Sequence, residues 1–517
     1  MEQKFLKVNK LDNVVVIINK ASKGDYINID GEIITLLDDV PLAHKIAIRE
    51  IEKDEAIIKY GHEIGRALKP IKVGQWVHTH NLICERGKID RGITKVAERK
   101  TECWTGPYSG KEMSFMGYKR PYGGVGTRNH LLILSNVFCA NNAAEQINRA
   151  LPDSVLIRHS IGCGQIGFDL ELSARTLKSM AKHPNVGAVI IVGLGCERLK
   201  AKEIYDDVVN QTGKEARLFI IQDEGGIDKT VEKAIKEGKK LQEGLLKEKR
   251  VPCLLSELFI TTKCGGTDSN SGLAANPVLG YASDCVVSAG GSSIISELNE
   301  LIGTEDFLAS RAVDDDVKRK IYSSMYSIED FLKSCIEPSL PDHRNQLISP
   351  GNFDGGVSSI VEKALGGVHK CGSAPIVDVL DYALPPKDSK KGLFMMSYES
   401  VDGEVTTGMI GCGSQVVCFT TGRGNPTGHP IAPVIKITGN HEVYEKMKDD
   451  FDFDASPLIR EGKSLQELGE ELFSLIIKVA NGELTSAERH HGNELFCMPR
   501  RHGCKMTEKD DIQHNYC

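Results

Sequence analysis

Three regions with different patterns of hydrophobic and polar residues follow one another along the chain. Residues 1–83 contain short runs in which apolar and polar positions alternate, separated by Gly and Asp, as in NVVVIIN, GDYINID, HKIAIREI and QWVHTHN. This pattern is typical of a small all-β unit. From Gly126 onward, apolar runs such as HLLILSN and AVIIVGLG alternate with helical segments such as DLELSARTLKSMAKH. Helical connections of this length predict parallel strands.

These changes of pattern give the predicted domain limits. The sequence predicts an α/β multidomain protein in which a β domain at residues 1–92 precedes two parallel-sheet α/β domains, at 120–248 and 249–490. A polar, Gly-rich stretch at 93–119 is predicted to be a linker. Residues 491–517 are rich in Cys and His, but their spacing fits no standard metal site, so we expect a mobile surface tail.

Composition narrows the class of protein. Of 517 residues, 40% are hydrophobic and 26% are charged, as in soluble globular proteins, and no apolar run is long enough to span a membrane. The first residues, MEQKFLKVNK, do not resemble a signal peptide, so we expect a cytoplasmic protein whose fifteen cysteines are mostly reduced. The net charge of −7, with acids and bases interspersed, argues against nucleic acid as a partner.

Several cysteines stand directly beside glycine: Cys163, Cys196, Cys264, Cys371 and Cys412. The first three close apolar runs that are predicted to be strands, and Cys139 follows another such run. Because ligands of parallel α/β sheets bind beyond the carboxyl ends of the strands, these thiols are candidate metal ligands or reactive groups. Singly, each is as well explained as a small buried hydrophobe. The spacing is not C-x-x-C, and it leaves an iron–sulfur cluster and mononuclear iron both open.

Histidines and a lysine of the β domain form a second candidate set: His44, Lys45, His78 and His80. His78 and His80 are two residues apart and are predicted to point to the same face of a strand. Imidazoles placed in this way can bind metal or transfer protons near neutral pH. A merely polar sheet face would give the same spacing.

Candidate carboxylates follow the glycine-rich strand ends of the last domain. Asp268 lies in KCGGTDSNSG, and Glu297 and Glu300 lie three apart in a segment that also contains Glu305. Such carboxylates can bind a metal or act as a base alpha to a substrate carboxylate. For Glu300 and Glu305 the start of a solvated acidic helix is the simpler interpretation.

Two glycine-rich loops, 350–356 and 419–429, are candidate sites for an anionic substrate. Arg423 suits bidentate binding of a carboxylate, although an arginine at a tight turn can also be structural. The candidate substrate-binding residues are Asn352, Thr420, Thr421, Arg423 and Asn425. Fingerprints of nucleotide binding are absent, because Arg198 stands in VGLGCERL where the third glycine of GxGxxG belongs.

Long motifs resemble those of the altronate/galactarate dehydratase family. They include DDVPLAHKIAIREI, RPYGGVGTRNHLLILSNVFCA, HSIGCG, KCGGTDSNSGLAANPVLG, GGSSIISELNELIGTE and CFTTGRGNPTG, and they cover nearly the whole chain in order. The resemblance implies an N-terminal SAF (β-clip) domain, a second domain used in dimerisation, and a C-terminal variant Rossmann-like domain.

The resemblance also implies the chemistry. We expect an iron-dependent hydro-lyase that converts a sugar acid, altronate first and galactarate next, to its 2-keto-3-deoxy acid, with Mn²⁺ as an alternative metal and a homodimer as the assembly. In this hypothesis Cys163, Cys196 and Cys264 hold the iron, and the N-terminal domain delivers the histidines. Replacing His80 by Ala is then expected to abolish turnover while iron stays bound.

Departures from the family pattern keep three alternatives open. The stretch MMSYES at 395–400 lacks an acidic residue that many members carry, so the substrate could be another anion such as sulfolactate. A sugar-acid-binding protein without catalysis, and a structural or redox protein that uses its many thiols, are the other two.

Overall fold

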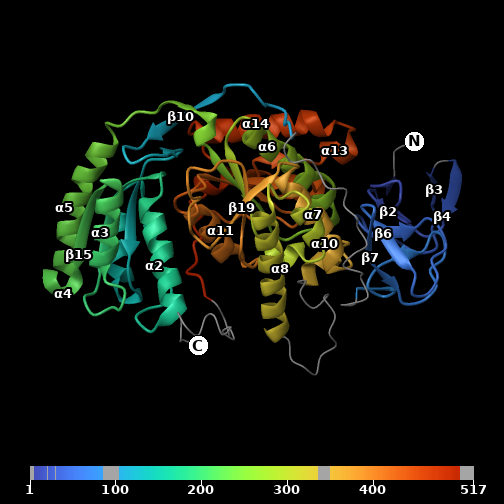
Figure 1. The fold of residues 1–517 in the computed structure, drawn as a ribbon, viewed down its shortest axis with the longest axis horizontal. Helices are drawn as coiled ribbons and strands as arrows, with labels where there is room; N and C mark the ends of the chain where they lie inside the picture. Colours follow the sequence, from blue (N-terminus) through green and yellow to red (C-terminus); the bar gives the residue numbers. More distant parts are fainter. Residues whose placement is uncertain (1–4, 20, 30, 85–103, 336–349, 501–517) are drawn as a thin grey trace.

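The fold consists of three parts that lie side by side (Figure 1). The computed structural model describes residues 5–19, 21–29, 31–84, 104–335 and 350–500. The N-terminal β domain is at one end, the four-stranded α/β domain at the other, and the seven-stranded α/β domain lies between them.

The N-terminal domain is built only of strands. They form sheets in the orders β1-β2-β5-β8, β3-β4 and β6-β7-β9. The alternation read from the sequence is visible in β3, where Ile27 and Ile29 are buried and Tyr26 is exposed. The strands are β1 (Phe5–Leu6), β2 (Val14–Ile17), β3 (Tyr26–Ile29), β4 (Glu32–Thr35), β5 (Lys45–Ala47), β6 (Ala56–Lys59), β7 (His62–Ala67), β8 (Trp76–Val77) and β9 (Leu82–Ile83).

The predicted linker is in part a strand. β10 (Ser114–Lys119) pairs antiparallel with β11 (Val125–Gly126) and with β16 (Val251–Leu254), so the entry to the second domain and the exit from it run through one small sheet. Polar and glycine residues made this stretch look structureless, but Phe115 is buried between the exposed residues Ser114 and Met116. The part of the predicted linker before residue 104 lies outside the described residues.

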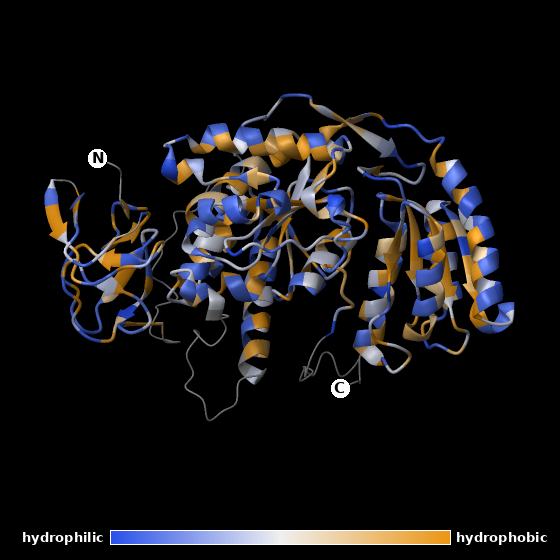
Figure 2. Cartoon of the chain, turned by 180° about the vertical axis from the view of Figure 1, so that it is seen from behind, coloured by the Kyte–Doolittle hydropathy of each residue, from blue (hydrophilic) through white to orange (hydrophobic). Residues whose placement is uncertain are grey.

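The second domain has a parallel sheet in the order β13-β12-β14-β15. Its strands are almost purely apolar because helices cover both faces, as the colouring of Figure 2 shows. Its main elements are β12 (His130–Ser135), α1 (Asn141–Ala150), β13 (Ser154–Ile157), α2 (Gly167–Lys182), β14 (Val186–Gly193), α3 (Ala201–Thr212), β15 (Glu215–Ile220), α4 (Ile221–Glu224) and α5 (Ile227–Leu245).

The third domain has a seven-stranded parallel sheet in the order β19-β20-β18-β17-β21-β22-β23. β18, β20 and β19 lie on one side of β17, and β21, β22 and β23 lie on the other, so the winding direction reverses between β17 and β21. The strands are β17 (Phe259–Cys264), β18 (Ser292–Ile295), β19 (Ile376–Leu380), β20 (Leu393–Met396), β21 (Val416–Thr420), β22 (Val434–Thr438) and β23 (Phe453–Asp454). A crevice at such a reversal is where open α/β sheets bind ligands. The expected Rossmann-like relationship of this sheet stays a prediction.

Helices cover both faces of the seven-stranded sheet. One face packs against α6 and α14, and the other packs against α11 and also against the second domain, with which it shares one apolar core. The helices are α6 (Asn276–Ser288), α7 (Glu305–Ala309), α8 (Asp315–Cys335), α9 (Pro350–Asp354), α10 (Ile360–Gly367), α11 (Asp402–Gly411), α12 (His441–Lys446), α13 (Pro457–Arg460), α14 (Leu465–Ala480) and α15 (Ser486–Arg489).

The beginning of the predicted tail belongs to the third domain. Leu495 and Met498 are buried in the core shared with the second domain. Residues from 501 onward lie outside the described residues. In the described part of the chain, no helix is both long enough and apolar enough to cross a membrane.

Candidate active site

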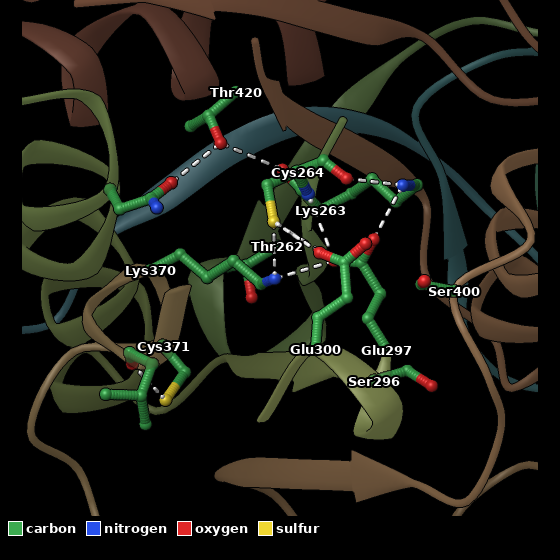
Figure 3. A network of polar contacts seen from close by, with 12 residues as sticks. Thr262, Lys263, Cys264, Ser296, Glu297, Glu300, Lys370, Cys371, Ser400 and Thr420 are labelled. Carbon is green, nitrogen blue, oxygen red and sulfur yellow. Dashed lines mark hydrogen bonds and ion pairs between the residues drawn. The ribbon is translucent and has the colours of Figure 1, made fainter. Parts of the chain in front are cut away.

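A buried network of charged side chains lies at the carboxyl ends of β17 and β18 (Figure 3). Lys263, the penultimate residue of β17, places its Nζ 2.6 Å from Glu297 Oε1 and 2.6 Å from Asp402 Oδ1. Lys370 Nζ lies 2.6 Å from the other oxygen of Glu297 and 2.9 Å from Cys264 Sγ. The side chains of both lysines and of Glu297 are 0% exposed. Charges buried this deeply persist only when they are paired, as these are.

Glu297 is the centre of this network. Burial alone would raise its pKa, but the two ammonium groups outweigh burial and hold the pKa at about 2. Its backbone adopts a left-handed conformation with φ of 69°, which is uncommon for a residue with a side chain. Its Oε2 also accepts the backbone N–H of Cys264, at 3.1 Å. Both carboxylate oxygens of the predicted catalytic Glu297 are therefore engaged by lysines, and its contacts fix the positions of Lys263, Lys370 and Cys264.

Both lysines of this network, Lys263 and Lys370, are absent from the candidate residues predicted from the sequence. Lys370 stands in Lys370-Cys371-Gly372, which repeats the tripeptide Lys263-Cys264-Gly265. Attention to the cysteines alone left both lysines out. The repeated tripeptide was the available signal, because the lysines of both copies bind Glu297.

The residues at this edge do not fit a resident metal. Among the described residues, only Cys264, Glu297 and Glu300 place three donor atoms within 4.8 Å of one another. However, Lys263 and Lys370 neutralise Glu297, and Lys363 Nζ lies 2.9 Å from Glu300 Oε1. Burial, with Glu297 nearby, raises the pKa of Cys264 to about 12, so the sulfur is a thiol. A divalent cation would meet ammonium groups and no unbalanced negative charge.

The three thiols expected to hold iron do not share one edge. Cys264 is buried in the third domain, whereas Cys163 and Cys196 are exposed in the second domain, where they follow β13 and β14. The prediction assumed that all strand ends converge, but strand ends meet only within one sheet. Of the set Cys163, Cys196 and Cys264, only Cys264 contacts the charged network.

Asp268 lies in the loop that follows β17, shortly after Cys264. Its carboxylate accepts hydrogen bonds from Ser271 Oγ at 2.8 Å and from Asn440 Nδ2 at 3.0 Å. The loop after β21 approaches so closely that a Cβ at Gly422 would lie 2.2 Å from Asp268 Oδ1. Burial raises the pKa of Asp268 against these hydrogen bonds. Asp268 is therefore closely surrounded by polar groups, beside the point between β17 and β21 where the winding direction of the sheet reverses.

The glycine-rich segment 350–356 joins this loop to the N-terminal domain. Gly355 O accepts the N–H of Ser269 at 2.9 Å, and Gly356 O accepts Lys45 Nζ at 3.2 Å. Gly356 has φ of +89°, and a Cβ there would lie 2.4 Å from Ala43 O. Asn352, predicted to bind substrate, is buried within this segment. Two of the predicted residue sets are therefore brought together through segment 350–356.

The predicted histidines do not lie on one face of a strand. β8 ends at Val77, and His78 begins a turn that Asn81 Oδ1 closes by accepting the N–H of His78 at 2.9 Å. His78 is consequently buried against Trp76, whereas His80 is exposed. The extended geometry assumed for the H-x-H motif was wrong, because an Asn three residues after His78 favours a turn.

His44 and His78 form the buried part of this histidine set. Their ring centroids lie 4.8 Å apart. His44 Nδ1 accepts Trp76 Nε1–H at 3.2 Å and its Nε2 lies 3.4 Å from Asp354 O, so both of its nitrogens are engaged. Burial, followed by the charge of Lys45, lowers the pKa of His78 to about 3, and its Nδ1 has no hydrogen-bond partner among the described residues. His78 is a neutral imidazole with a nitrogen available.

Lys45 fixes the N-terminal domain to the third domain. Lys45 Nζ lies 2.9 Å from Glu362 Oε2, and Lys59 Nζ lies 2.6 Å from Glu362 Oε1, all fully buried. Burial raises the pKa of Glu362 but the two lysines lower it further, so it stays ionised. The next residue of α10, Lys363, binds Glu300 of the charged network. The helix α10 thus links the lysines of the β domain to the edge that carries Cys264.

The loop after β21 uses its threonines for its own structure. Thr420 Oγ1 donates to Asn276 Oδ1 at 2.7 Å, and Thr421 Oγ1 accepts the N–H groups of Arg423, Gly424 and Asn425. Asn425 Nδ2 lies 3.4 Å from Asp402 Oδ2, and Arg423 is exposed. Of the residues predicted to bind substrate in this loop, Arg423 is the one whose side chain is available.

A cleft of about 600 Å³ opens between the N-terminal and third domains, which is large enough for a six-carbon acid. Asn270 and Asn440, both partners of Asp268, line it together with His441 and the exposed Arg460. None of these four residues stands out in the sequence, because a cleft between domains leaves no local pattern.

Models of known protein families match each of the three domains. A model of the SAF domain of altronate/galactarate dehydratase matches residues 3–85. A model of the second domain of D-galactarate dehydratase/altronate hydrolase matches 117–245, and one of the C-terminal domain of D-galactarate/altronate dehydratase matches 255–502. The chain belongs to the altronate/galactarate dehydratase family. Membership of this family makes it an enzyme of the hydro-lyase type.

Two curated relatives align along nearly the whole chain, and a third aligns along three quarters of it. Altronate dehydratase of Bacillus subtilis is 34% identical over 504 residues, which are 95% of this chain and 98% of the relative. Galactarate dehydratase (L-threo-forming) of Escherichia coli is 31% identical over 502 residues, 93% of each chain. The beta subunit of (2R)-sulfolactate sulfo-lyase of Chromohalobacter salexigens is 35% identical over 397 residues, 75% of this chain and 98% of that subunit.

Proposed function

We propose that this enzyme dehydrates a sugar acid to its 2-keto-3-deoxy acid, with altronate as the first candidate and galactarate as the next. The observation that carries the proposal is the alignment with altronate dehydratases across all three domains, at 95% of this chain. The cleft between the SAF domain and the third domain supports it, because polar side chains from both domains surround a volume of suitable size.

Dehydration of a 2,3-dihydroxy acid begins with removal of the proton alpha to the carboxylate. The base must be unprotonated at neutral pH and must have an available lone pair. His78 meets both conditions, because burial lowers its pKa to about 3 and its Nδ1 has no partner among the described residues. We assign the proton transfer to His78 Nδ1. His44, whose two nitrogens are engaged, holds the neighbouring ring in place.

The leaving group and the negative charge need partners as well. The 3-hydroxyl departs as water once it receives a proton, and the resulting enol rearranges to the 2-keto acid. Arg460, an exposed residue that lines the cleft, offers a guanidinium for the substrate carboxylate, and Asn270 offers its amide for a hydroxyl group. Since the Cys264 edge does not fit a metal, none of these assignments uses one.

A lyase of the same family that acts on sulfolactate is the second candidate. The beta subunit named above aligns with 75% of this chain. The alpha subunit of the same sulfo-lyase is 45% identical over 49 residues, which are 10% of this chain and 52% of that subunit. In this candidate sulfite leaves in place of water, and the same base removes the alpha proton.

An anaerobic assay of the full chain against altronate, galactarate and sulfolactate tests both candidates. Formation of 2-keto-3-deoxy acid from one sugar acid supports the proposal, and its loss in His78→Gln supports the assigned base. Sulfite release from sulfolactate alone replaces the proposal by the second candidate. Tight binding of an acid without any product would instead make the chain a binding protein. The homodimer stays a prediction, which light scattering of the purified chain tests.

A further inference from the structure

The exposed cysteines of the second domain lie at one edge of its sheet. The structure describes eleven cysteine side chains, and three of them are exposed: Cys139, Cys163 and Cys196. They follow β12, β13 and β14, which are adjacent parallel strands. Cysteine is among the most buried residue types, so three exposed thiols gathered at one edge need an explanation other than packing.

Hydrogen bonds hold the three cysteine loops against one another. Asn141 Nδ2 donates to His159 O at 3.0 Å, and His159 N–H donates to Asn141 Oδ1 at 3.0 Å, which joins the loops of Cys139 and Cys163. A Cβ at Gly162 would lie 3.6 Å from Phe138 Cβ. Asn136, at the end of β12, donates its amide to Leu199 O at 2.6 Å, three residues beyond Cys196. The loops are therefore fixed relative to one another.

A second observation at this edge points to a ligand. Gln165, two residues after Cys163, is only 7% exposed, yet neither its Oε1 nor its Nε2 has a hydrogen-bond partner among the described residues. Asn136 Oδ1 is likewise buried without a partner. A buried amide without partners costs about 1–3 kcal/mol, so its retention indicates a group that approaches it. A Cβ at Gly164 would meet nothing within 4 Å, which leaves space beside Cys163.

The spacing of the thiols selects the kind of ligand. None of the three is in a disulfide. Among the described residues, the only set of three donors within 4.8 Å is that of Cys264, so Cys139, Cys163 and Cys196 are too far apart to bind a single ion together. A cluster of several iron atoms is wider than one ion, and thiolates from distant parts of a sequence are its usual ligands.

We infer that Cys139, Cys163 and Cys196 hold an iron–sulfur cluster at the carboxyl edge of the second domain. Three thiolates would satisfy three iron atoms of a four-iron cluster and leave the fourth without a thiolate from this set. The buried amide of Gln165, two residues after Cys163, would be available to hydrogen-bond a cluster-bound group. The inference is independent of the sugar acid that the enzyme uses, and it places iron apart from the buried charged network that does not fit a metal.

Anaerobic reconstitution of the full chain with Fe²⁺ and sulfide tests the inference. We expect about four iron and four sulfide per chain, a broad visible absorption and an EPR signal after reduction. Cys139→Ser, Cys163→Ser and Cys196→Ser should each lose most of the iron and sulfide. Cys264→Ser and Cys497→Ser are the matched controls and should retain both. Circular dichroism verifies that each variant is folded.

Peptide-level alkylation gives a second measurement on the unmodified protein. The reconstituted protein should protect Cys139, Cys163 and Cys196 from iodoacetamide, and removal of iron by a chelator should expose all three. Retention of the cluster in the three single variants, loss of it in Cys264→Ser, or iron without sulfide would each overturn the inference. A cluster that assembles in an enzyme without dehydratase turnover would overturn the proposed function and leave this inference intact.

Discussion

The carboxyl edges of the two parallel sheets carry the same local motif and have different chemistry. In both, an apolar strand runs into a cysteine flanked by glycine. At the edge of the second domain, Cys163 and Cys196 are exposed, and the loops around them contribute amides. At the edge of the third domain, Cys264 is buried among Lys263, Lys370 and Glu297.

What covers each edge explains the difference. α10, the segment around Lys370 and the SAF domain are laid over the third-domain edge, and each contributes a lysine. The lysines neutralise the carboxylates, while burial and the nearby Glu297 raise the pKa of Cys264 and keep it a thiol, against the opposite effect of Lys370. The edge of the second domain has no comparable set of buried lysines among the described residues, so its thiols are free to become ligands. A strand-end cysteine is thus a donor or an inert thiol according to the charges that other segments place beside it.

Removing Glu297 should break the third-domain edge most severely. Glu297→Gln leaves Lys370 as a buried ammonium without a carboxylate, and we expect the free energy of unfolding to fall by about 3–5 kcal/mol in urea denaturation. Glu232→Gln, at an exposed position of α5, is the control and should change it by less than about 0.5 kcal/mol. Equal stability of the two variants would show that the network is not paired as described.

The same variant has a pH signature. The pKa of Glu297 is about 2 in the folded protein and 4.5 ordinarily, so its contribution to stability is complete above pH 4.5 and is lost as the pH falls through 2. The wild-type protein should lose stability across this window more steeply than Glu297→Gln does. Parallel curves would contradict the depressed pKa.

Substitutions of His78 and of His80 test which of the two histidines acts as the base. We expect His78→Gln to lower kcat by about 10²–10³, because the neutral imidazole of His78 is the assigned base. His80→Gln should lower kcat less than about tenfold, since His80 is exposed. Steady-state rates of both variants, measured on the sugar acid that the wild type uses, check this. A larger loss for His80 would restore the role that sequence spacing alone assigned to it.

Lys263 and Lys436 both lie against the ring of Phe419, and comparing them tests how much ion pairing with carboxylates contributes to stability. Lys263 is bound by two carboxylates, whereas Lys436 Nζ has no hydrogen-bond partner among the described residues and lies 3.8 Å from the centre of the Phe419 ring. We expect Lys436→Met to raise the free energy of unfolding by about 1–3 kcal/mol at pH 7, because it removes a buried group without a partner. Lys263→Met, the matched variant, should lower it because it removes the ammonium that Glu297 and Asp402 share.

The pH dependence of the gain follows from the pKa of Lys436, which burial lowers from 10.5 to about 7. Between these values the unfolded chain binds more protons than the folded one, so wild-type stability rises with pH. The advantage of Lys436→Met should therefore shrink as the pH approaches 10.5. An advantage that is constant from pH 7 to 10.5 would argue against a neutral lysine.

Removing Lys370 should allow the third-domain edge to bind a metal, as we infer for the second-domain edge. In Lys370→Met, Cys264, Glu297 and Glu300 keep their mutual distances but lose an ammonium 2.9 Å from the sulfur. We expect Co²⁺ to bind at least about tenfold more tightly than to the wild type, with a thiolate–cobalt absorption band. The double variant with Cys264→Ser should lack the band. Equal binding by the wild type would contradict the conclusion that its charges exclude a metal.

Local pattern alone determined the order of the elements and the family. Alternation predicted the β domain, apolar runs separated by helices predicted the parallel sheets, and long motifs indicated the dehydratase family, which the comparisons confirmed. Period and composition act over a few residues, so they are readable in the sequence. Short-range rules still failed at His78, whose backbone N–H donates to Asn81 Oδ1 and closes a turn in place of a strand.

Only the tertiary structure decided which candidates share a site. It separated Cys163 and Cys196 from Cys264 by assigning them to different sheets, and it added Lys370, which lies 106 residues after Cys264 in the sequence. Ion pairs such as Lys45 with Glu362 join residues 317 positions apart, and no local pattern records them. The chain specified the chemical groups, and the packing of three domains decided which of them became neighbours and, through burial and charge, which protonation states they hold.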